Sequence, residues 1–169
     1  MDNAIPCDAQ AVPAAEGEPL VGPFTEAVSA VFSEMASAGA AVQAVYRQPS
    51  SRTVGELSAL LRLRSVGEAA LVLSCPRPTA RALAERVLSG VTEPLDDGMI
   101  GDCLGELANV IAGQAKALLA GTPHHFTFSP PTIVTGVGKE VGKAGDEGSL
   151  VIVFGSEVGE FALQLCADL

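Results

Sequence analysis

The stretch that most constrains the fold runs from Asp97 to Gly121, where apolar residues recur with the period of an α-helix. A helix turns about 100° per residue, so Asp102, Glu106 and Asn109 lie within about 60° of one another on one face. The apolar residues that we place on the opposite face are Leu104, Leu107, Ile111, Ala115 and Leu118. The pattern predicts a long amphipathic helix with one face in the core, while the other presents two carboxylates and a carboxamide.

Signals at both ends bound this helix. Asp96 or Asp97 is placed to cap its N-terminus, and Gly121 follows its C-terminus. Gly105 and Gly113 lie on the polar side of the helix, although a glycine in a helix interior costs about 1 kcal/mol relative to alanine. We interpret the two glycines as positions where another surface approaches the helix closely.

Length and charge favour one globular domain with few classes of partner. The chain has 169 residues, of which 48% are hydrophobic and 18% are charged, and this composition is typical of a folded protein. Its net charge is -10, so a phosphate backbone or an anionic membrane would repel it. We therefore expect neither a nucleic-acid nor a membrane partner.

Cysteine usage and the absence of apolar runs predict a cytoplasmic protein. The four cysteines, Cys7, Cys75, Cys103 and Cys166, form no CxxC pair, and we expect free thiols in a reducing compartment. The sequence shows no charged-then-apolar leader and no uninterrupted apolar run approaching 18 residues. We therefore expect neither export nor a membrane span.

The order of elements predicts an α/β (α+β) sandwich, in which long helices pack on one mixed or antiparallel sheet. Residues 1–22 are acidic, rich in Pro and Ala and without apolar period, so we expect a flexible tail followed by a domain over 23–169. Residues 53–64 also fit a helical stripe, but we favour a strand there that forms a hairpin with 69–74. The other expected elements are helix 23–39, strand 42–47, helix 79–89, strand 132–135, loop 136–148 and a hairpin of 150–154 with 160–167.

A short internal parallel suggests a repeated unit. Residues 33–37 read SEMAS and residues 105–109 read GELAN, both within expected helices that are followed by strands. Two copies of a helix-plus-strands unit would produce this parallel, and so would coincidence between two Ala-rich amphipathic helices.

Several other groupings of polar residues have simpler interpretations than catalysis. Asp96, Asp97 and Asp102 suit the positive end of the helix dipole better than a metal site, and we expect no metal ligands in the chain. Adjacent His124 and His125 have no nearby Cys or third His, which disfavours zinc. The stretch 136–139 lacks the GxxxxGK[ST] spacing of a phosphate loop, so we expect a flexible connection there.

The polar face of the long helix leaves two interpretations open. Glu106 and Asn109 sit one turn apart, and a carboxamide can orient a water molecule while a carboxylate engages a cation. The same residues also fit the solvated side of an ordinary amphipathic helix.

Two segments together resemble a known family. The run Asp102-x3-Glu106-x2-Asn109 continues as VIAGQAK through Gly113 and Lys116, and after a turn the chain reads SPPTIV over 129–134. With the opening PFxxAxxxVFxxM of residues 23–35, this pattern resembles the CheX/CheC-like chemotaxis phosphatases, and the CheX branch in particular. The resemblance extends over residues 23–169.

The resemblance implies a CheC-like fold, a homodimer paired through sheet edges, and hydrolysis of the aspartyl phosphate on a CheY-type response regulator. Asn109 would orient the attacking water, and Glu106 would contact the regulator's lysine. The regulator would supply Mg²⁺, so the chain would need no cofactor of its own. The resemblance also implies docking roles, less defined than these, for Asp102, Gly105, Gly113 and Lys116. Ser37 stands where a second Glu-x2-Asn motif, beginning at Glu34, would place its asparagine, so we expect one active face per chain.

The same resemblance leaves an alternative from another class. The chain could keep the fold and act as a non-catalytic receiver-binding or scaffold domain of a two-component or motility system. The presence of both Glu106 and Asn109 favours catalysis.

Overall fold

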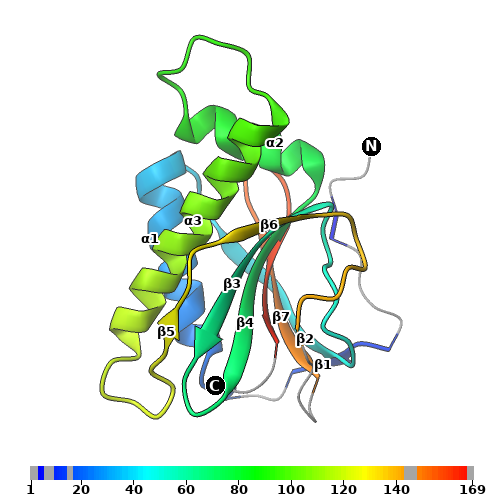
Figure 1. Cartoon of the computed structure of the whole chain (residues 1–169), viewed down its shortest axis with the longest axis vertical. Helices are drawn as coiled ribbons and strands as arrows, with labels where there is room; N and C mark the ends of the chain where they lie inside the picture. The colour runs from blue at the N-terminus through cyan, green and yellow to red at the C-terminus, as the bar shows by residue number, and fades with distance from the viewer. Residues whose placement is uncertain (1–3, 6–9, 15–16, 143–147, 167–169) are drawn as a thin grey trace.

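The computed structural model describes residues 4–5, 10–14, 17–142 and 148–166 (Figure 1). Eleven helices and strands follow one another along the described chain. They are β1 (Val12–Pro13), α1 (Val21–Ala36), β2 (Ala41–Gln48), β3 (Leu57–Arg64), β4 (Glu68–Cys75), α2 (Arg77–Val87), α3 (Asp97–Leu118), β5 (Thr127–Phe128), β6 (Thr132–Thr135), β7 (Ser149–Gly155) and β8 (Phe161–Cys166).

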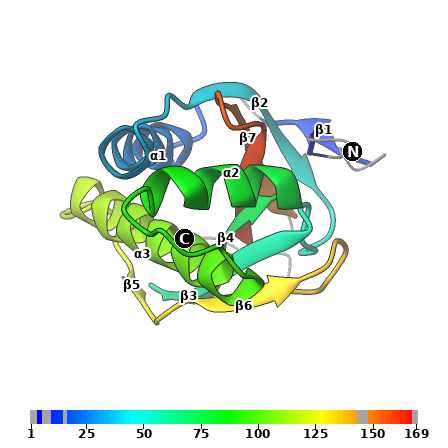
Figure 2. The ribbon, with the colours of Figure 1, turned by 90° about the horizontal axis from the view of Figure 1, so that it is seen from above.

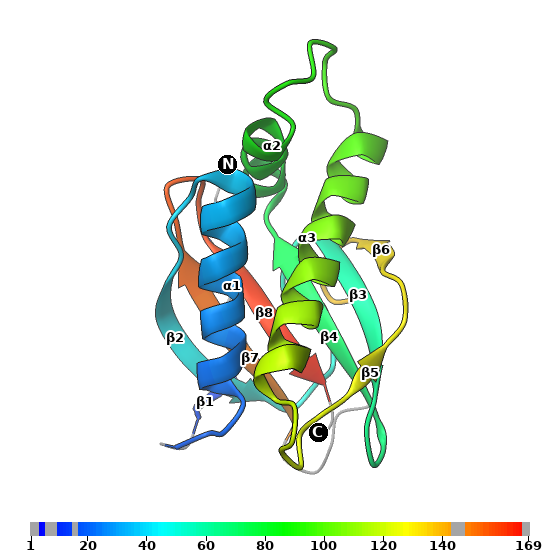
Figure 3. The ribbon, with the colours of Figure 1, turned by 90° about the vertical axis from the view of Figure 1, so that its left-hand side faces the viewer.

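One antiparallel sheet forms a layer against which the helices pack, which confirms the predicted fold class. Its strand order is β1-β2-β7-β8-β4-β3-β5, and β6 also pairs with β3. Figures 2 and 3 show α1 and α3 side by side on one face of this sheet, with α2 across one end of it. The expected hairpin of β3 with β4 is present, with Leu57 opposite Cys75 and Arg64 opposite Glu68, and so is the closing hairpin of β7 with β8.

The topology supports the repeated unit suggested by the sequence. In each unit a helix precedes a single strand and a hairpin: α1, β2 and β3–β4 in the first, α3, β6 and β7–β8 in the second. The hairpins meet where β4 pairs with β8 at the centre of the sheet. Each single strand pairs with the hairpin of the other unit, β2 with β7 and β6 with β3. This exchange of strands joins the units into one sheet.

The core between sheet and helices is aliphatic, with a few stacked aromatic rings. The rings of Phe32 and Phe161 lie 4.3 Å apart, and those of Phe161 and Phe154 lie 5.0 Å apart. The apolar face of α3 is buried as predicted, with one exception: Leu118 is 43% exposed. The helix ends at this residue, and the next residue, Leu119, turns into the core in its place.

The N-terminal stretch contains more structure than its composition predicts. The expectation of no regular structure before residue 23 was wrong in two places, because β1 pairs with β2 and α1 begins at Val21. Leu20 is buried, and Glu18 forms a 3.0 Å ion pair with Arg47 of β2. These contacts were invisible in the sequence, since each depends on a strand elsewhere in the chain. The division into a 1–22 tail and a 23–169 domain stays a prediction.

Two further boundaries and one loop differ from expectation. Helix α2 begins at Arg77 rather than residue 79, because Pro78 is tolerated in a first turn that needs no amide hydrogen there. Strand β5 was not predicted. Residues 136–141 are tied to residues 51–53 by backbone hydrogen bonds, such as Gly138 N to Thr53 O at 2.9 Å. Of the expected loop and last strand, residues 143–147 and 167 lie outside the described residues.

None of the helices in the described ranges is both long and apolar enough to cross a membrane.

Candidate functional site

Helix α3 is fixed at its N-terminus by the aspartates expected there. The Asp96 carboxylate accepts a hydrogen bond from the Met99 amide at 2.8 Å, which confirms Asp96 as the capping residue. Asp97 lies in the first turn, where a negative charge is favourable, and its carboxylate is 3.3 Å from the Arg77 guanidinium of α2. The first contact caps α3, and the second links its start to α2.

The polar face of α3 carries the residues singled out in the sequence. Asp102 and Glu106 are exposed, whereas Asn109 is half-buried. In the described part of the chain, no hydrogen bond or ion pair engages these three side chains. The Asn109 amide is also not among the buried polar atoms that lack a partner, so solvent reaches it. The face therefore offers a carboxylate and a carboxamide, one helical turn apart, that are free to bind another molecule.

The close approach inferred at the glycines is made by the chain itself. Gly105 is buried, and a Cβ built on it would lie 3.3 Å from Pro131 Cγ. A Cβ on Gly101, one turn earlier, would lie 3.5 Å from Ile133 Cγ2. The missing side chains let β6 and the residues before it pack against α3.

Gly113 and Lys116 adjoin an aromatic ring. A Cβ on Gly113 would lie 4.0 Å from Phe128 Cζ, an ordinary contact distance. The Lys116 ammonium lies 5.9 Å from the centroid of the same ring, within the range of a cation–π interaction. Lys116 is half-buried and is the one basic residue of α3.

The thiols of the described residues are unsuited to catalysis. Cys75, Cys103 and Cys166 are free and buried, as expected, while Cys7 lies outside the described residues. Burial raises the pKa of Cys75 and Cys166 to about 12, and burial together with the nearby Glu106 charge raises the pKa of Cys103 to about 11. All three therefore remain protonated at neutral pH and are poor nucleophiles.

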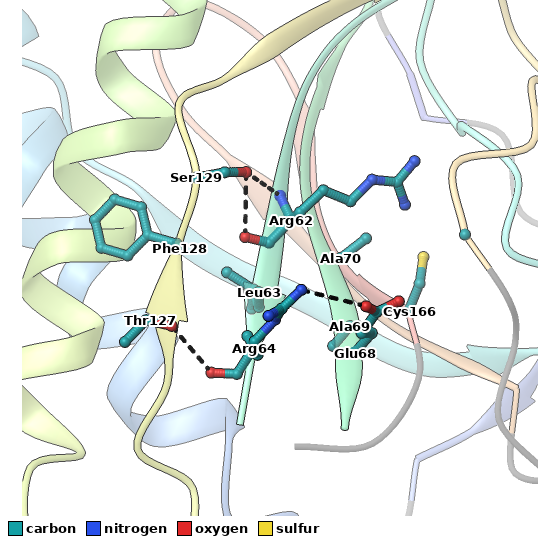
Figure 4. Close-up of a pocket in the computed structure, with 11 residues that line it drawn as sticks. Arg62, Leu63, Arg64, Glu68, Ala69, Ala70, Thr127, Phe128, Ser129 and Cys166 are labelled. Carbon is teal, nitrogen blue, oxygen red and sulfur yellow. Dashed lines mark hydrogen bonds and ion pairs between the residues drawn. The ribbon is translucent and has the colours of Figure 1, made fainter. Parts of the chain in front are cut away.

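An open pocket of about 690 Å³ lies beside β3 and β4, apart from the polar face of α3 (Figure 4). Its walls include Arg62 and Arg64, but both guanidinium groups already have partners. Arg62 donates to the Val141 carbonyl at 2.6 Å, and Arg64 pairs with Glu68 at 3.5 Å. The pocket brings together none of the site residues predicted from sequence.

Among the described residues, no three His, Cys, Asp or Glu side chains are grouped so that they could hold a metal ion.

Helix α1 does not repeat the arrangement of α3. Glu34 is exposed like Glu106, but Ser37, the counterpart of Asn109, is the C-cap of α1 with a left-handed φ of 49°. Its carbonyl accepts a hydrogen bond from Arg86 at 3.0 Å. The helix has thus ended where the asparagine would stand, and no carboxamide accompanies Glu34.

Comparison with known proteins identifies the family. The family model for chemotaxis phosphatase CheX matches residues 57–155, more than half of the chain, including all of α3. The chain belongs to the CheX family. None of the curated proteins with which it was compared matches its sequence.

Solved structures show that the likeness in fold extends beyond the matched residues. A protein of Desulfovibrio vulgaris Hildenborough is similar with a TM-score of 0.78 and 25% identity, over 90% of this chain and 99% of that one. CheX of Desulfovibrio desulfuricans gives a TM-score of 0.76 and 23% identity, over 88% of this chain and 99% of that one. The CheX–CheY–BeF₃–Mg²⁺ complex of Borrelia burgdorferi gives a TM-score of 0.63 and 20% identity, over 88% of this chain and 96% of that one.

The sequence did not predict that the stretch from Phe128 to Pro131 runs beside α3 (Figure 1). The sequence contains both partners of this contact, the two glycines of α3 and the SPPTIV motif. It does not show that they meet, because the contact forms only when the chain folds.

Proposed function

We propose that the chain is a phosphatase that hydrolyses the aspartyl phosphate of a CheY-type response regulator. One observation carries the proposal: Glu106 and Asn109 project from one face of α3 without any partner in the described chain. Membership of the CheX family supports it, and so does the likeness to a CheX found in complex with CheY.

The proposed chemistry divides the site between two proteins. The Asn109 carboxamide enters the regulator's active site and holds a water molecule in line with the phosphorus. The water oxygen bonds to phosphorus as the bond to the aspartyl oxygen breaks, which releases inorganic phosphate and restores the aspartate. Phosphoryl transfer depends mainly on positioning and charge stabilisation, so one well-placed carboxamide is a sufficient contribution from this chain.

Glu106 contributes docking and alignment. Its exposed carboxylate pairs with the regulator's active-site lysine, and this ion pair sets how deeply α3 approaches the phosphoryl group. The regulator supplies Mg²⁺. Glu106 therefore acts on affinity and alignment, whereas Asn109 acts on the chemical step.

The test measures phosphate release from a phosphorylated regulator with and without the protein. Wild type shortens the lifetime of the phospho-regulator, while Asn109→Ala lowers the acceleration by on the order of 100-fold or more. Glu106→Gln raises the concentration of phospho-regulator that is needed for a half-maximal rate. Glu85→Gln, an equal change of charge at an exposed position on α2, is the control and should behave as wild type.

The same assay decides between catalysis and a scaffold role. If wild type lengthens or leaves unchanged the lifetime of every phosphorylated receiver from the source organism, the phosphatase proposal is wrong. Binding without hydrolysis would then indicate a receiver-binding scaffold.

A further inference from the structure

Residues 128–131, here called the flanking segment, run along α3 beside Asn109. Phe128 adjoins Gly113, and Pro131 adjoins Gly105. Asn109 lies four residues from each glycine, midway between the two contacts along the helix and also in rotation about its axis. The segment therefore passes the helix at the level of Asn109, and Figure 1 shows it alongside α3.

The flanking segment is held firmly to the sheet on its other side. The Ser129 hydroxyl accepts a hydrogen bond from the Arg62 amide at 3.3 Å and donates one to the Arg62 carbonyl at 3.4 Å. The Ser129 amide donates to the same carbonyl at 3.0 Å. On either side of Ser129 and the two prolines, β5 and β6 both pair with β3. The segment is thus fixed between β3 and α3.

Burial along α3 agrees with a wall on one side of Asn109. Relative to Asp102, Gly101 lies at about -100° around the helix, Gly105 at about -60° and Asn109 at about -20°. Burial falls in the same order, because both glycines are buried, Asn109 is half-buried and Asp102 is exposed. Gly113, at about 20°, is half-buried where the Phe128 ring reaches it, whereas Glu106, at about 40°, is exposed. The flanking segment therefore borders Asn109 on the side of Gly105 and, through Phe128, toward the C-terminus of the helix, and leaves the direction of Glu106 open.

We propose that the flanking segment positions Asn109 for the proposed reaction. Pro131 fills the space left by Gly105, and Ser129 anchors the segment to β3, so this wall excludes rotamers of Asn109 that would turn its carboxamide toward the sheet edge. A carboxamide held in one orientation needs no ordering when the regulator docks. The inference rests on the phosphatase function proposed above and assigns Ser129 and Pro131 as positioning residues.

The kinetic test combines Ser129→Ala with Pro131→Ala and uses Pro49→Ala as the control, a proline at an exposed turn outside this site. The double variant should lower kcat about tenfold with KM changed less than twofold, and the control should match wild type. In an Asn109→Ala background the double variant should cause no further loss. An equal loss in both backgrounds, or a change in KM alone, would overturn the inference.

A second measurement does not depend on phosphatase activity. The chain contains two asparagines, Asn3 and Asn109, so ¹⁵N-asparagine labelling gives two side-chain amide signals, and Asn109→Ala identifies the relevant one. Its two proton shifts should differ from random-coil values in wild type and in Pro49→Ala, and they should move toward random-coil values in Ser129→Ala/Pro131→Ala. An unchanged Asn109 signal in a folded double variant would refute the positioning role whatever the activity, whereas failure of wild type to hydrolyse the phosphate would refute only the function.

Discussion

At the scale of single residues, the site has a gradient of charge along α3. Glu106 carries a negative charge, Asn109 is neutral, and Lys116 lies two turns further on with its ammonium over the Phe128 ring. These seven residues from Asn109 to Lys116 span about 10 Å along the axis. At low ionic strength this separation is shorter than the Debye length, so the charge of Lys116 contributes to the electrostatic potential around Asn109.

Reversal of this charge should weaken the encounter with a phosphorylated regulator. Lys116→Glu introduces a negative charge about 10 Å along the helix axis from Asn109, in a protein whose net charge is already -10, while the regulator brings a dianionic phosphoryl group. We expect kcat/KM to fall about fivefold in low salt and the difference to shrink as salt is added.

Lys139→Glu provides the matched control for Lys116→Glu. It changes the net charge by the same amount at an exposed position outside α3. Its kcat/KM should stay within twofold of wild type at every salt concentration. If the two reversals behave alike, net charge rather than the position of Lys116 determines the effect.

At the scale of elements, patterns of known period were predictable and pairwise contacts were not. The long helix and the hairpin of β3 with β4 follow from spacing within one segment. Two-residue strands such as β1 carry no period of their own, since they exist only because a neighbouring strand pairs with them. For the same reason Glu106 and Asn109 could be predicted to share an outward face, whereas the packing of Pro131 on Gly105 could not.

The two glycines of α3 should differ when replaced by alanine. Gly113→Ala should raise the unfolding free energy by about 0.5–1 kcal/mol, because alanine favours the helix and its Cβ has room beside Phe128. Gly105→Ala should show less gain or a loss, because its Cβ would press on Pro131 Cγ at 3.3 Å. Urea denaturation measures both values, and equal stabilisation by the two variants would contradict the packing described here.

At the scale of the whole molecule, the sheet has β1 at one edge and β5 with β6 at the other. The edge formed by β6 adjoins the flanking segment and hence the proposed site. Homodimerisation through a sheet edge stays a prediction. Light scattering during size-exclusion chromatography should give about twice the chain mass of 17.2 kDa, and a monomer at high concentration would contradict it.

In the proposed mechanism, Asn109 acts on the chemical step while the rest of the face of α3 docks the regulator. The most direct measurement compares Asn109→Ala with wild type in two assays: affinity for a beryllofluoride-activated regulator, and phosphate release from the phosphorylated one. We predict affinities within about threefold of each other and, for the variant, a release rate close to that of the regulator alone. If Asn109→Ala releases phosphate from the regulator as fast as wild type does, Asn109 does not act on the chemical step.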